Sequence, residues 1–386
     1  MAAPSLASER PATPQEAAEL LRALGADGRA VRVRGGGTKS RWAAAGDPVA
    51  VELSTDGLNR VLEHNEGDFT AVLEAGVPFA EAAATFAQTG QMLALDPPLG
   101  AGDAATVGGV VATADSGPLR HRYGSARDLI VGITVALSDG SLANAGGKVI
   151  KNVAGYDLGK LFAGSFGTLG LVVSVAVRLH PRPEETATAW GSSEDVTRLG
   201  AAAGALARLP LEADSLDVAW QDGTGRLLVR FGGAAAERQA AAVADRLRAA
   251  GLDDVDATGD DDALWAAQRD GQRSADGAVL KVSGRPADLE RVLAAARDSG
   301  AGVVGRAAVG ISWLTLRGDD LPARVTAIRA ALAPRACTLL DAPDDLRAEV
   351  PAWAEPHPGA LAVMRRVKER FDPARIFAPG TFVGGI

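Results

Sequence analysis

The most informative part of this sequence runs Gly146-Gly147-Lys148-Val149-Ile150-Lys151-Asn152-Val153-Ala154-Gly155-Tyr156-Asp157-Leu158 and continues to Gly167-Thr168-Leu169-Gly170, just before an apolar run at 171–177. We expect a glycine-rich approach, a short helix and a second glycine turn that leads into a strand. Glycine permits positive φ angles and lets backbone N–H groups approach a ligand closely. The pattern is therefore typical of loops that line a phosphate group or the edge of a ring.

Two further glycine clusters lie upstream, each beside an apolar strand: Arg34-Gly35-Gly36-Gly37-Thr38-Lys39 and Ala105-Thr106-Val107-Gly108-Gly109. A single cluster of this kind has little specificity. Together with the first stretch, they indicate an extended cofactor that contains a diphosphate.

The composition excludes several classes of protein. The chain has 386 residues, enough for two or three domains and a large core, and its net charge of −8 argues against nucleic acid and anionic membrane surfaces as partners. Glycine accounts for 46 residues, above the usual share of about 7%. Most of this excess falls before residue 170 and at the C-terminus, which indicates functional loops.

Cys337 is the one cysteine of the chain. The chain therefore cannot build a disulfide framework, a cysteine-ligated iron–sulfur cluster or a cysteine zinc site by itself, and no pair of its histidines has the spacing of metal ligands. We expect no metal site and a reducing, cytoplasmic location. No apolar run is long enough to span a bilayer, so we expect no transmembrane segment.

The expected elements divide the chain into five parts. A motif-rich first domain ends at the punctuation His180-Pro181-Arg182-Pro183. We expect a flexible tail at 1–14, the first domain at 15–183, a second domain at 184–342, an acidic, proline-rich linker at 343–358 and a C-terminal segment at 359–386 that carries an amphipathic helix over 361–371.

The second domain has a repeated pattern. It reads as strand, helix, strand, strand, helix, and then a similar set again, with helices expected at 195–209, 235–250, 286–298 and 321–333. Helices over an antiparallel sheet, in the ferredoxin-like manner, satisfy this order of elements.

The glycine clusters and the tail with Phe371-Asp372-Pro373 and Pro379-Gly380 resemble the vanillyl-alcohol-oxidase/PCMH flavoprotein superfamily. Within it, the stretch 147–158 is most similar to the FAD-binding subunits of bacterial glycolate oxidases. The resemblance covers about 28–183 and 360–383. It implies an α+β fold, with a two-lobed PCMH-type FAD-binding domain and a ferredoxin-like α+β cap domain.

The resemblance also implies roles for individual residues. The first pyrophosphate loop would be Arg34, Gly35, Gly36, Gly37, Thr38 and Lys39, and the second would be Thr106, Val107, Gly108 and Gly109 at a helix N-terminus, where free N–H groups favour the diphosphate. Ser116 and Gly117 would lie near the flavin ring. Gly167, Leu169, Gly170 and Val172 would pass the adenine and ribose.

Two departures from the superfamily's pattern affect function. Relatives with covalently attached flavin carry a histidine where this chain has Thr38 and Lys39, so we expect FAD to be bound non-covalently. Catalytic 2-hydroxyacid dehydrogenases of the superfamily carry histidines in a late Gly-Asp-Gly-containing motif. Nothing similar occurs in this sequence.

Few residues qualify as catalytic candidates, and the catalytic base stays unknown. His121 could reach the flavin face or a subunit interface, although a basic surface loop is the favoured reading. Arg269 and Lys281 could grip a substrate carboxylate from the cap, although exposed positions are the default for both. All three are therefore weak candidates.

Two functions remain open. The first is the FAD-binding subunit of a glycolate oxidase complex, which transfers electrons from the oxidation of glycolate or D-lactate. Its partners would be a catalytic FAD-containing subunit and an iron–sulfur subunit, and these would make any contact with the inner face of the membrane. The alternative is a self-sufficient FAD-dependent D-2-hydroxyacid dehydrogenase or oxidase. A reductase that uses a nicotinamide nucleotide is a weaker possibility, because the sequence has no separate fingerprint for that cofactor.

Overall fold

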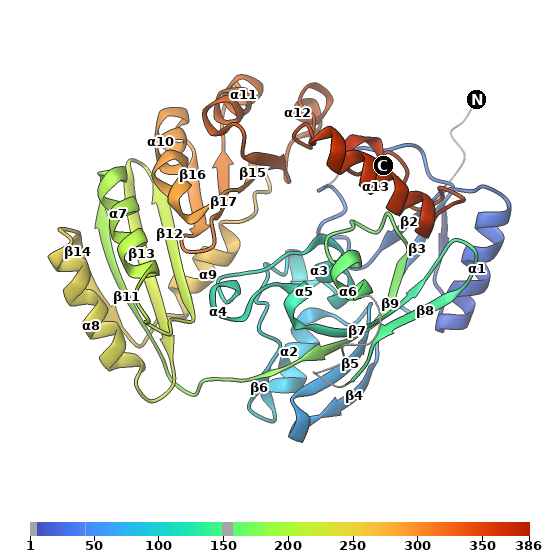
Figure 1. The fold of residues 1–386 in the computed structure, drawn as a ribbon, viewed down its shortest axis with the longest axis horizontal. Helices are drawn as coiled ribbons and strands as arrows, with labels where there is room; N and C mark the ends of the chain where they lie inside the picture. The colour runs from blue at the N-terminus through green and yellow to red at the C-terminus, as the bar shows by residue number, and fades with distance from the viewer. Residues whose placement is uncertain (1–5, 43, 149–156) are drawn as a thin grey trace.

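The computed structural model describes residues 6–42, 44–148 and 157–386. The centre of the informative motif, 149–156, lies outside the described residues, and with it Lys151 and Tyr156. The chain forms a first domain of two lobes and a cap that faces it (Figure 1). The expected α+β class is confirmed.

The first lobe is a small parallel sheet with one helix. Its strands follow the order β1 (Ala7–Glu9), β3 (Val51–Ser54) and β2 (Val31–Arg34). Helix α1 (Pro14–Ala26) begins after Thr13, whose hydroxyl accepts a hydrogen bond from the N–H of Glu16 at 3.1 Å. The flexible tail expected over 1–14 differs from the structure in its described part, because residues 7–9 pair with β3.

The second lobe is a five-stranded antiparallel sheet. Its buried face packs on α2 (Phe79–Ala87), α3 (Val107–Thr113), α5 (Ala126–Leu129) and α6 (Leu158–Phe162). The opposite face gives Val173 to a core shared with the first lobe, where it meets Leu21 and Leu53. The strand order is β4 (Val61–Asn65), β5 (Thr70–Glu74), β9 (Leu171–Arg178), β7 (Ile130–Ala136) and β8 (Leu142–Gly146), and the short strands β6 (Gln91–Met92) and β10 (His180–Pro181) pair beside it.

The cap confirms the repeated pattern. Each half has the order strand, helix, strand, strand, helix, strand, and the halves join edge to edge in one eight-stranded antiparallel sheet. The strand order is β14 (Asp253–Thr258), β11 (Thr186–Ser193), β13 (Thr224–Gly232), β12 (Ser215–Gln221), β16 (Gly302–Arg306), β17 (Ile311–Leu316), β15 (Ala278–Ser283) and β18 (Ala336–Leu339). These are two ferredoxin-like units in succession.

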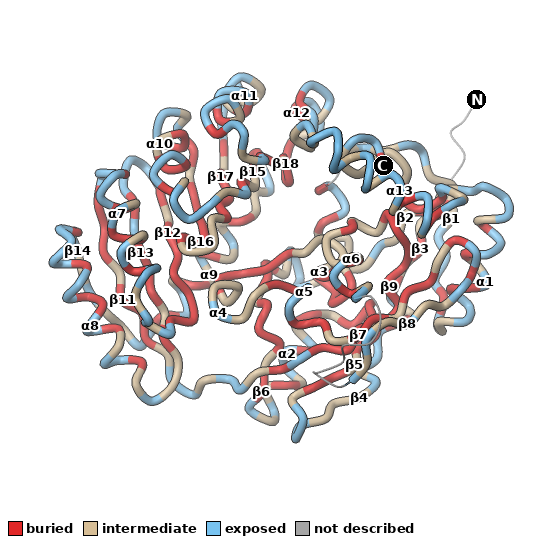
Figure 2. Tube along the Cα trace, in the orientation of Figure 1, coloured by how far each residue is buried: buried red, intermediate tan, exposed pale blue. Residues whose placement is uncertain are grey.

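The two faces of the cap sheet differ. Helices α7 (Val196–Ala207), α8 (Ala236–Ala249), α10 (Leu289–Ser299) and α11 (Leu321–Leu332) bury one face in a continuous apolar core. Helix α9 (Asp262–Asp270) links the halves and lies on the face toward the first domain, where Trp265 donates a hydrogen bond to the Thr188 hydroxyl at 2.8 Å (Figure 1). Strands are mainly buried and the outer helix faces mainly exposed (Figure 2).

The C-terminal segment returns to the first domain. The linker expected over 343–358 is more ordered than predicted, because it contains α12 (Asp344–Glu349) and because Trp353 packs edge-on against Phe166 at 5.1 Å. Helix α13 (Pro358–Phe371) follows, and its Lys368 Nζ donates to the Thr168 carbonyl and to Asp372 Oδ2, each at 2.7 Å. This buried ion pair fixes the C-terminal segment beside the Gly167 turn.

Candidate functional site

A cleft in the first domain brings the glycine clusters together, and we call it the glycine cleft. It lies where β2, the start of α3, the Gly167 turn and the C-terminal segment meet. Twelve of the sixteen residues predicted to bind the cofactor line it: Arg34, Gly35, Gly36, Gly37, Thr38, Lys39, Thr106, Gly108, Gly109, Gly167, Gly170 and Val172.

The first glycine loop, Gly35 to Lys39, presents free backbone donors. In the part of the chain that the structure describes, none of the N–H groups of residues 35–39 donates to a protein acceptor. The turn is closed through the Gly37 carbonyl, which accepts from the N–H and hydroxyl of Ser40, and Gly37 has a φ of +72°. Successive free N–H groups in a turn form a concavity that binds anions.

The second cluster has a different role from the one expected. The N–H of Val107 donates to Val77 O at 2.9 Å, and the N–H of Gly108 donates to Ala75 O at 2.7 Å. The N–H of Gly109 donates to the capping hydroxyl of Thr106 at 3.2 Å. The expectation of free N–H groups at this helix N-terminus is therefore wrong, because the carbonyls of the turn after strand β5 and the Thr106 hydroxyl already accept from them.

Glycine is needed here for close packing between loops. A Cβ at Gly36 would lie 1.5 Å from the Ala104 carbonyl oxygen, and a Cβ at Gly35 would lie 2.3 Å from Thr106 Oγ1. These distances are far below van der Waals contact, so side chains are excluded. The first loop can therefore lie directly on the second.

Charged groups surround the cleft. Arg32 and Arg34 each lie 3.3 Å from Glu52, and Arg34 stays half-exposed. Lys39 lies 3.3 Å from Asp115 with both side chains buried. Burial lowers the pKa of Lys39, and the neighbouring Asp115 carboxylate opposes that shift. Free N–H groups and arginine cations fit an anionic cofactor such as a diphosphate.

Four predicted residues lie away from the cleft lining in the described structure. Val107 and Leu169 are buried in the core of the second lobe. Ser116 accepts a hydrogen bond from Arg120 at 3.2 Å, and the Gly117 N–H donates to the Leu95 carbonyl. The other residues that line the cleft were not predicted, because they lie outside the stretches chosen for their glycine motifs. They are Arg32, Val33, Ser40, Ala44, Ala45, Glu52, Thr55, Ala75, Ala112, Thr113, Phe166, Ala378 and Thr381.

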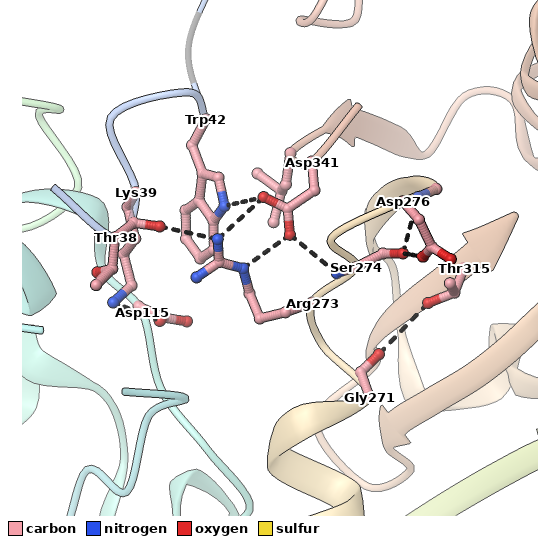
Figure 3. Close-up of polar contacts among 12 residues, drawn as sticks. Thr38, Lys39, Trp42, Asp115, Gly271, Arg273, Ser274, Asp276, Thr315 and Asp341 are labelled. Atoms are coloured by element: carbon pink, nitrogen blue, oxygen red, sulfur yellow. Dashed lines mark hydrogen bonds and ion pairs between the residues drawn. The ribbon is translucent and has the colours of Figure 1, made fainter. Parts of the chain in front are cut away.

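The cap touches the first glycine loop directly (Figure 3). Arg273 Nη2 donates to the Thr38 carbonyl at 2.8 Å and to Asp341 Oδ1 at 3.1 Å, while Nε donates to Asp341 Oδ2 at 2.7 Å. The Trp42 indole N–H donates to the same carboxylate at 3.0 Å. The loop and the cap are therefore joined through the partly buried Arg273 and the buried Asp341.

The catalytic candidates lie at the boundary between the cap and the first domain. Burial lowers the pKa of Lys281, and the negative charge of Asp115 opposes that shift. The Lys281 ammonium lies 5.8 Å from the centre of the Trp313 ring. Arg269, on α9, carries a positive charge that opposes the rise in the pKa of Asp96. Each of these two cap cations therefore interacts electrostatically with a carboxylate of the first domain, Lys281 with Asp115 and Arg269 with Asp96.

Two carboxyl groups of this boundary, those of the buried Asp217 and the partly buried Asp96, have perturbed pKa values. Burial raises the pKa of Asp96 to about 8, with Arg306 and Arg269 opposing the shift. Burial also raises the pKa of Asp217 to about 7, although Arg306 donates to it at 2.6 Å. A carboxyl group with a pKa near neutrality is able to exchange protons under working conditions.

The four histidines are tied to structural partners or to the domain boundary. His64 forms a hydrogen bond with Gln91 at 2.9 Å, the His180 ring packs at a tilt against Tyr123, and His357 caps α13. His121 lies on the short helix α4 (Arg120–Tyr123) with Nδ1 buried, and burial lowers its pKa. None of the four lines the glycine cleft in the described structure. Over the same residues, no group of three or more His, Cys, Asp or Glu side chains is placed to hold a metal ion.

Comparison with known proteins identifies the cofactor. Residues 6–146 match the model of an FAD binding domain, and residues 354–382 match that of the C-terminal domain of FAD linked oxidases. The chain is an FAD-dependent oxidoreductase with an FAD-binding domain over residues 6–146. Relatives matched over shorter stretches are named as D-lactate, D-2-hydroxyglutarate and glycolate enzymes.

The matches differ in extent. An uncharacterized FAD-linked oxidoreductase of Mycobacterium tuberculosis is 29% identical over 97% of this chain and 90% of its own length. The glycolate oxidase subunit GlcE of Escherichia coli is 37% identical over 32% of this chain and 35% of its own length. A solved alkyldihydroxyacetonephosphate synthase superposes with a TM-score of 0.68 at 17% identity, covering 97% of this chain and 77% of that one, which supports the fold. Among the described residues, no helix of this oxidoreductase is both long and apolar enough to cross a membrane.

Proposed function

We propose that FAD lies in the glycine cleft, with its diphosphate on the free N–H groups of residues 35–39. The support is the set of unused donors beside Arg34, together with the open space at Gly109 and Gly167. The residues that line the cleft orient the cofactor and exclude water from its diphosphate. When bound, FAD supplies the capacity to accept two electrons from a substrate and pass them on.

We further propose that this chain is the FAD-binding subunit of a complex of the glycolate oxidase type. The observation that carries this proposal is the placement of all four histidines away from the cleft, since oxidation of a hydroxyl group requires a positioned base, most often histidine. The partial similarity to GlcE supports it. A catalytic flavoprotein subunit and an iron–sulfur subunit complete the complex, with glycolate or D-lactate as substrate. We place it in the cytoplasm, with any contact to the inner face of the membrane made by the partners.

One observation favours the alternative, a self-sufficient D-2-hydroxyacid dehydrogenase. Asp96 has its pKa raised to about 8 by burial, and it lies close to Arg269 and Arg306. A hydroxy acid held by Lys281 and Arg269 would then meet Asp96, which accepts a proton only in its ionised form, and activity would therefore rise as the pH approaches 8. Only this alternative places the substrate carboxylate at the boundary between the cap and the FAD domain of this chain.

Turnover by the isolated chain distinguishes the two. We expect the purified chain, saturated with FAD, to reduce an artificial dye with glycolate or D-lactate no faster than a no-substrate control. Coexpression with a catalytic flavoprotein and an iron–sulfur protein should restore activity. Steady-state turnover of several per second by the isolated chain, abolished by Asp96→Asn or His121→Ala, would refute the subunit function and establish the dehydrogenase.

The mode of attachment gives a separate prediction. Because Thr38 and Lys39 stand where covalent relatives carry histidine, acid precipitation should release the yellow flavin into the supernatant. Absorbance near the flavin band, measured in supernatant and pellet, checks this. Colour retained by the washed pellet would mean that another residue attaches the cofactor.

A further inference from the structure

Arg273 is a cap residue that reaches across to the cofactor-binding loop. Its guanidinium is shared between the Asp341 carboxylate of the cap and the Thr38 carbonyl of the first glycine loop (Figure 3). The contact with Thr38 spans 235 positions of sequence at 2.8 Å. It is therefore a tertiary link between the domains.

The hydrogen bond to the Thr38 carbonyl also determines the direction of the next backbone N–H, because the peptide group is planar. In a planar trans peptide the C=O and the following N–H point in opposite directions. Arg273 draws the Thr38 carbonyl toward the cap, so the Lys39 N–H of the same peptide points away from the cap. Thr38 and Lys39 both line the glycine cleft, and that N–H has no acceptor among the described residues. Arg273 thus acts on the orientation of a free donor.

The arginine itself is held in place. Asp341 accepts from the indole N–H of Trp42 at 3.0 Å and from the Ser274 N–H at 3.2 Å, so its carboxylate is fixed from both domains. The guanidinium lies 5.1 Å from the centre of the Trp42 ring, and Trp42 is almost fully buried. A guanidinium with a fixed fork is suited to carry this geometry, whereas lysine offers a single point charge.

We propose that Arg273 is a positioning residue for the cofactor loop, and that it makes FAD affinity and the seating of the cap depend on one another. FAD binding favours the peptide orientation that Arg273 holds, and a seated cap favours the loop conformation that binds FAD. Because the two equilibria are linked, cap seating changes the free energy of FAD binding by the same amount as FAD binding changes the free energy of cap seating. The inference rests on the proposal that the glycine cleft is the FAD site.

The test compares Arg273→Met with a matched control, Arg335→Met. Arg335 pairs with Asp288 inside the cap at 2.8 Å, with side-chain exposures of 24% and 16%, close to the 23% and 9% of the pair Arg273–Asp341. Arg335 does not line the glycine cleft. The FAD dissociation constant is measured by flavin fluorescence on apoprotein of the full chain, below the unfolding temperature of each variant.

We expect Arg273→Met to weaken FAD binding about tenfold, a coupling in the usual range, and Arg335→Met to change it less than twofold. Hydrogen exchange provides the second readout. In the wild type and in Arg335→Met, saturating FAD should slow exchange in the cap peptides around 271–277 and 339–342. In Arg273→Met, saturating FAD should protect the loop 35–39 but no longer these cap peptides.

Two outcomes overturn the inference. One is equal FAD affinity in both arginine variants, and the other is FAD-dependent protection of the cap that persists without Arg273. If Arg273→Met fails to fold, Arg273→Lys takes its place, and it must lose the cap protection while keeping the charge. Failure of the cleft assignment is recognised separately, because FAD would then bind normally when the cleft itself is obstructed at Gly109.

Discussion

Replacing Lys368 by Met should lower the free energy of unfolding by roughly 3–5 kcal/mol, the cost of leaving a buried charge without its partner. The Lys368 ammonium is buried and donates to Asp372, to the Thr168 carbonyl and to the Phe377 carbonyl. Methionine fills similar space but donates nothing, so a fully buried carboxylate loses its cation. Urea unfolding followed by circular dichroism measures the change.

The control is Lys160→Met, which removes a surface ion pair. Lys160 lies 3.1 Å from Asp157, and both side chains are about half exposed. Such pairs contribute up to about 1 kcal/mol, so this variant should stay close to the wild type. A Lys368→Met protein as stable as Lys160→Met would show that the C-terminal segment is not held by this ion pair. Because that segment gives Ala378 and Thr381 to the cleft, FAD binding should weaken along with stability.

Gly109→Val should abolish FAD binding while leaving the fold largely intact. Gly109 lines the cleft, and apart from its chain neighbours and the backbone of its own helix the one described heavy atom within 4 Å of an added Cβ is the Thr106 hydroxyl at 3.2 Å. A valine side chain therefore enters open space that we assign to the cofactor. Disturbing the Thr106 cap costs about 0.5–2 kcal/mol, which most domains tolerate.

Gly108 is different, although the sequence gives the two glycines equal weight. A Cβ there would lie 2.6 Å from Ala75 Cβ and 2.8 Å from the Ala75 carbonyl oxygen. Valine at 108 would push α3 away from Ala75, the residue that follows strand β5. That substitution therefore tests packing, and Gly109 is the site that tests the cofactor.

Local patterns predicted much of the fold. The helix N-terminus at Thr106 and the repeated order of strands and helices in the cap both appear in the structure. The glycine clusters indicated a diphosphate because glycine, which has no side chain, allows the backbone to approach a ligand closely. These features depend on neighbours in sequence.

The details of the site could not be predicted, because they depend on hydrogen bonds between residues far apart in the sequence. Whether an N–H is free depends on distant acceptors, and the carbonyls of Ala75 and Val77 consume the donors of the second cluster. The link from Arg273 to Thr38 joins segments without any shared motif. For the same reason the strand at 7–9 was missed, since its partner β3 lies far along the chain.

The FAD dissociation constant of Gly109→Val is the most direct test of the proposed cleft. It is measured on apoprotein beside the wild type and beside Gly67→Val, a control at an exposed glycine with no described heavy atom within 4 Å of an added Cβ. We predict that Gly67→Val binds FAD like the wild type and that Gly109→Val binds it at least about a hundredfold more weakly, or about 2.7 kcal/mol, with an unchanged far-ultraviolet spectrum. Equal dissociation constants in all three folded proteins would contradict the placement of FAD in the glycine cleft.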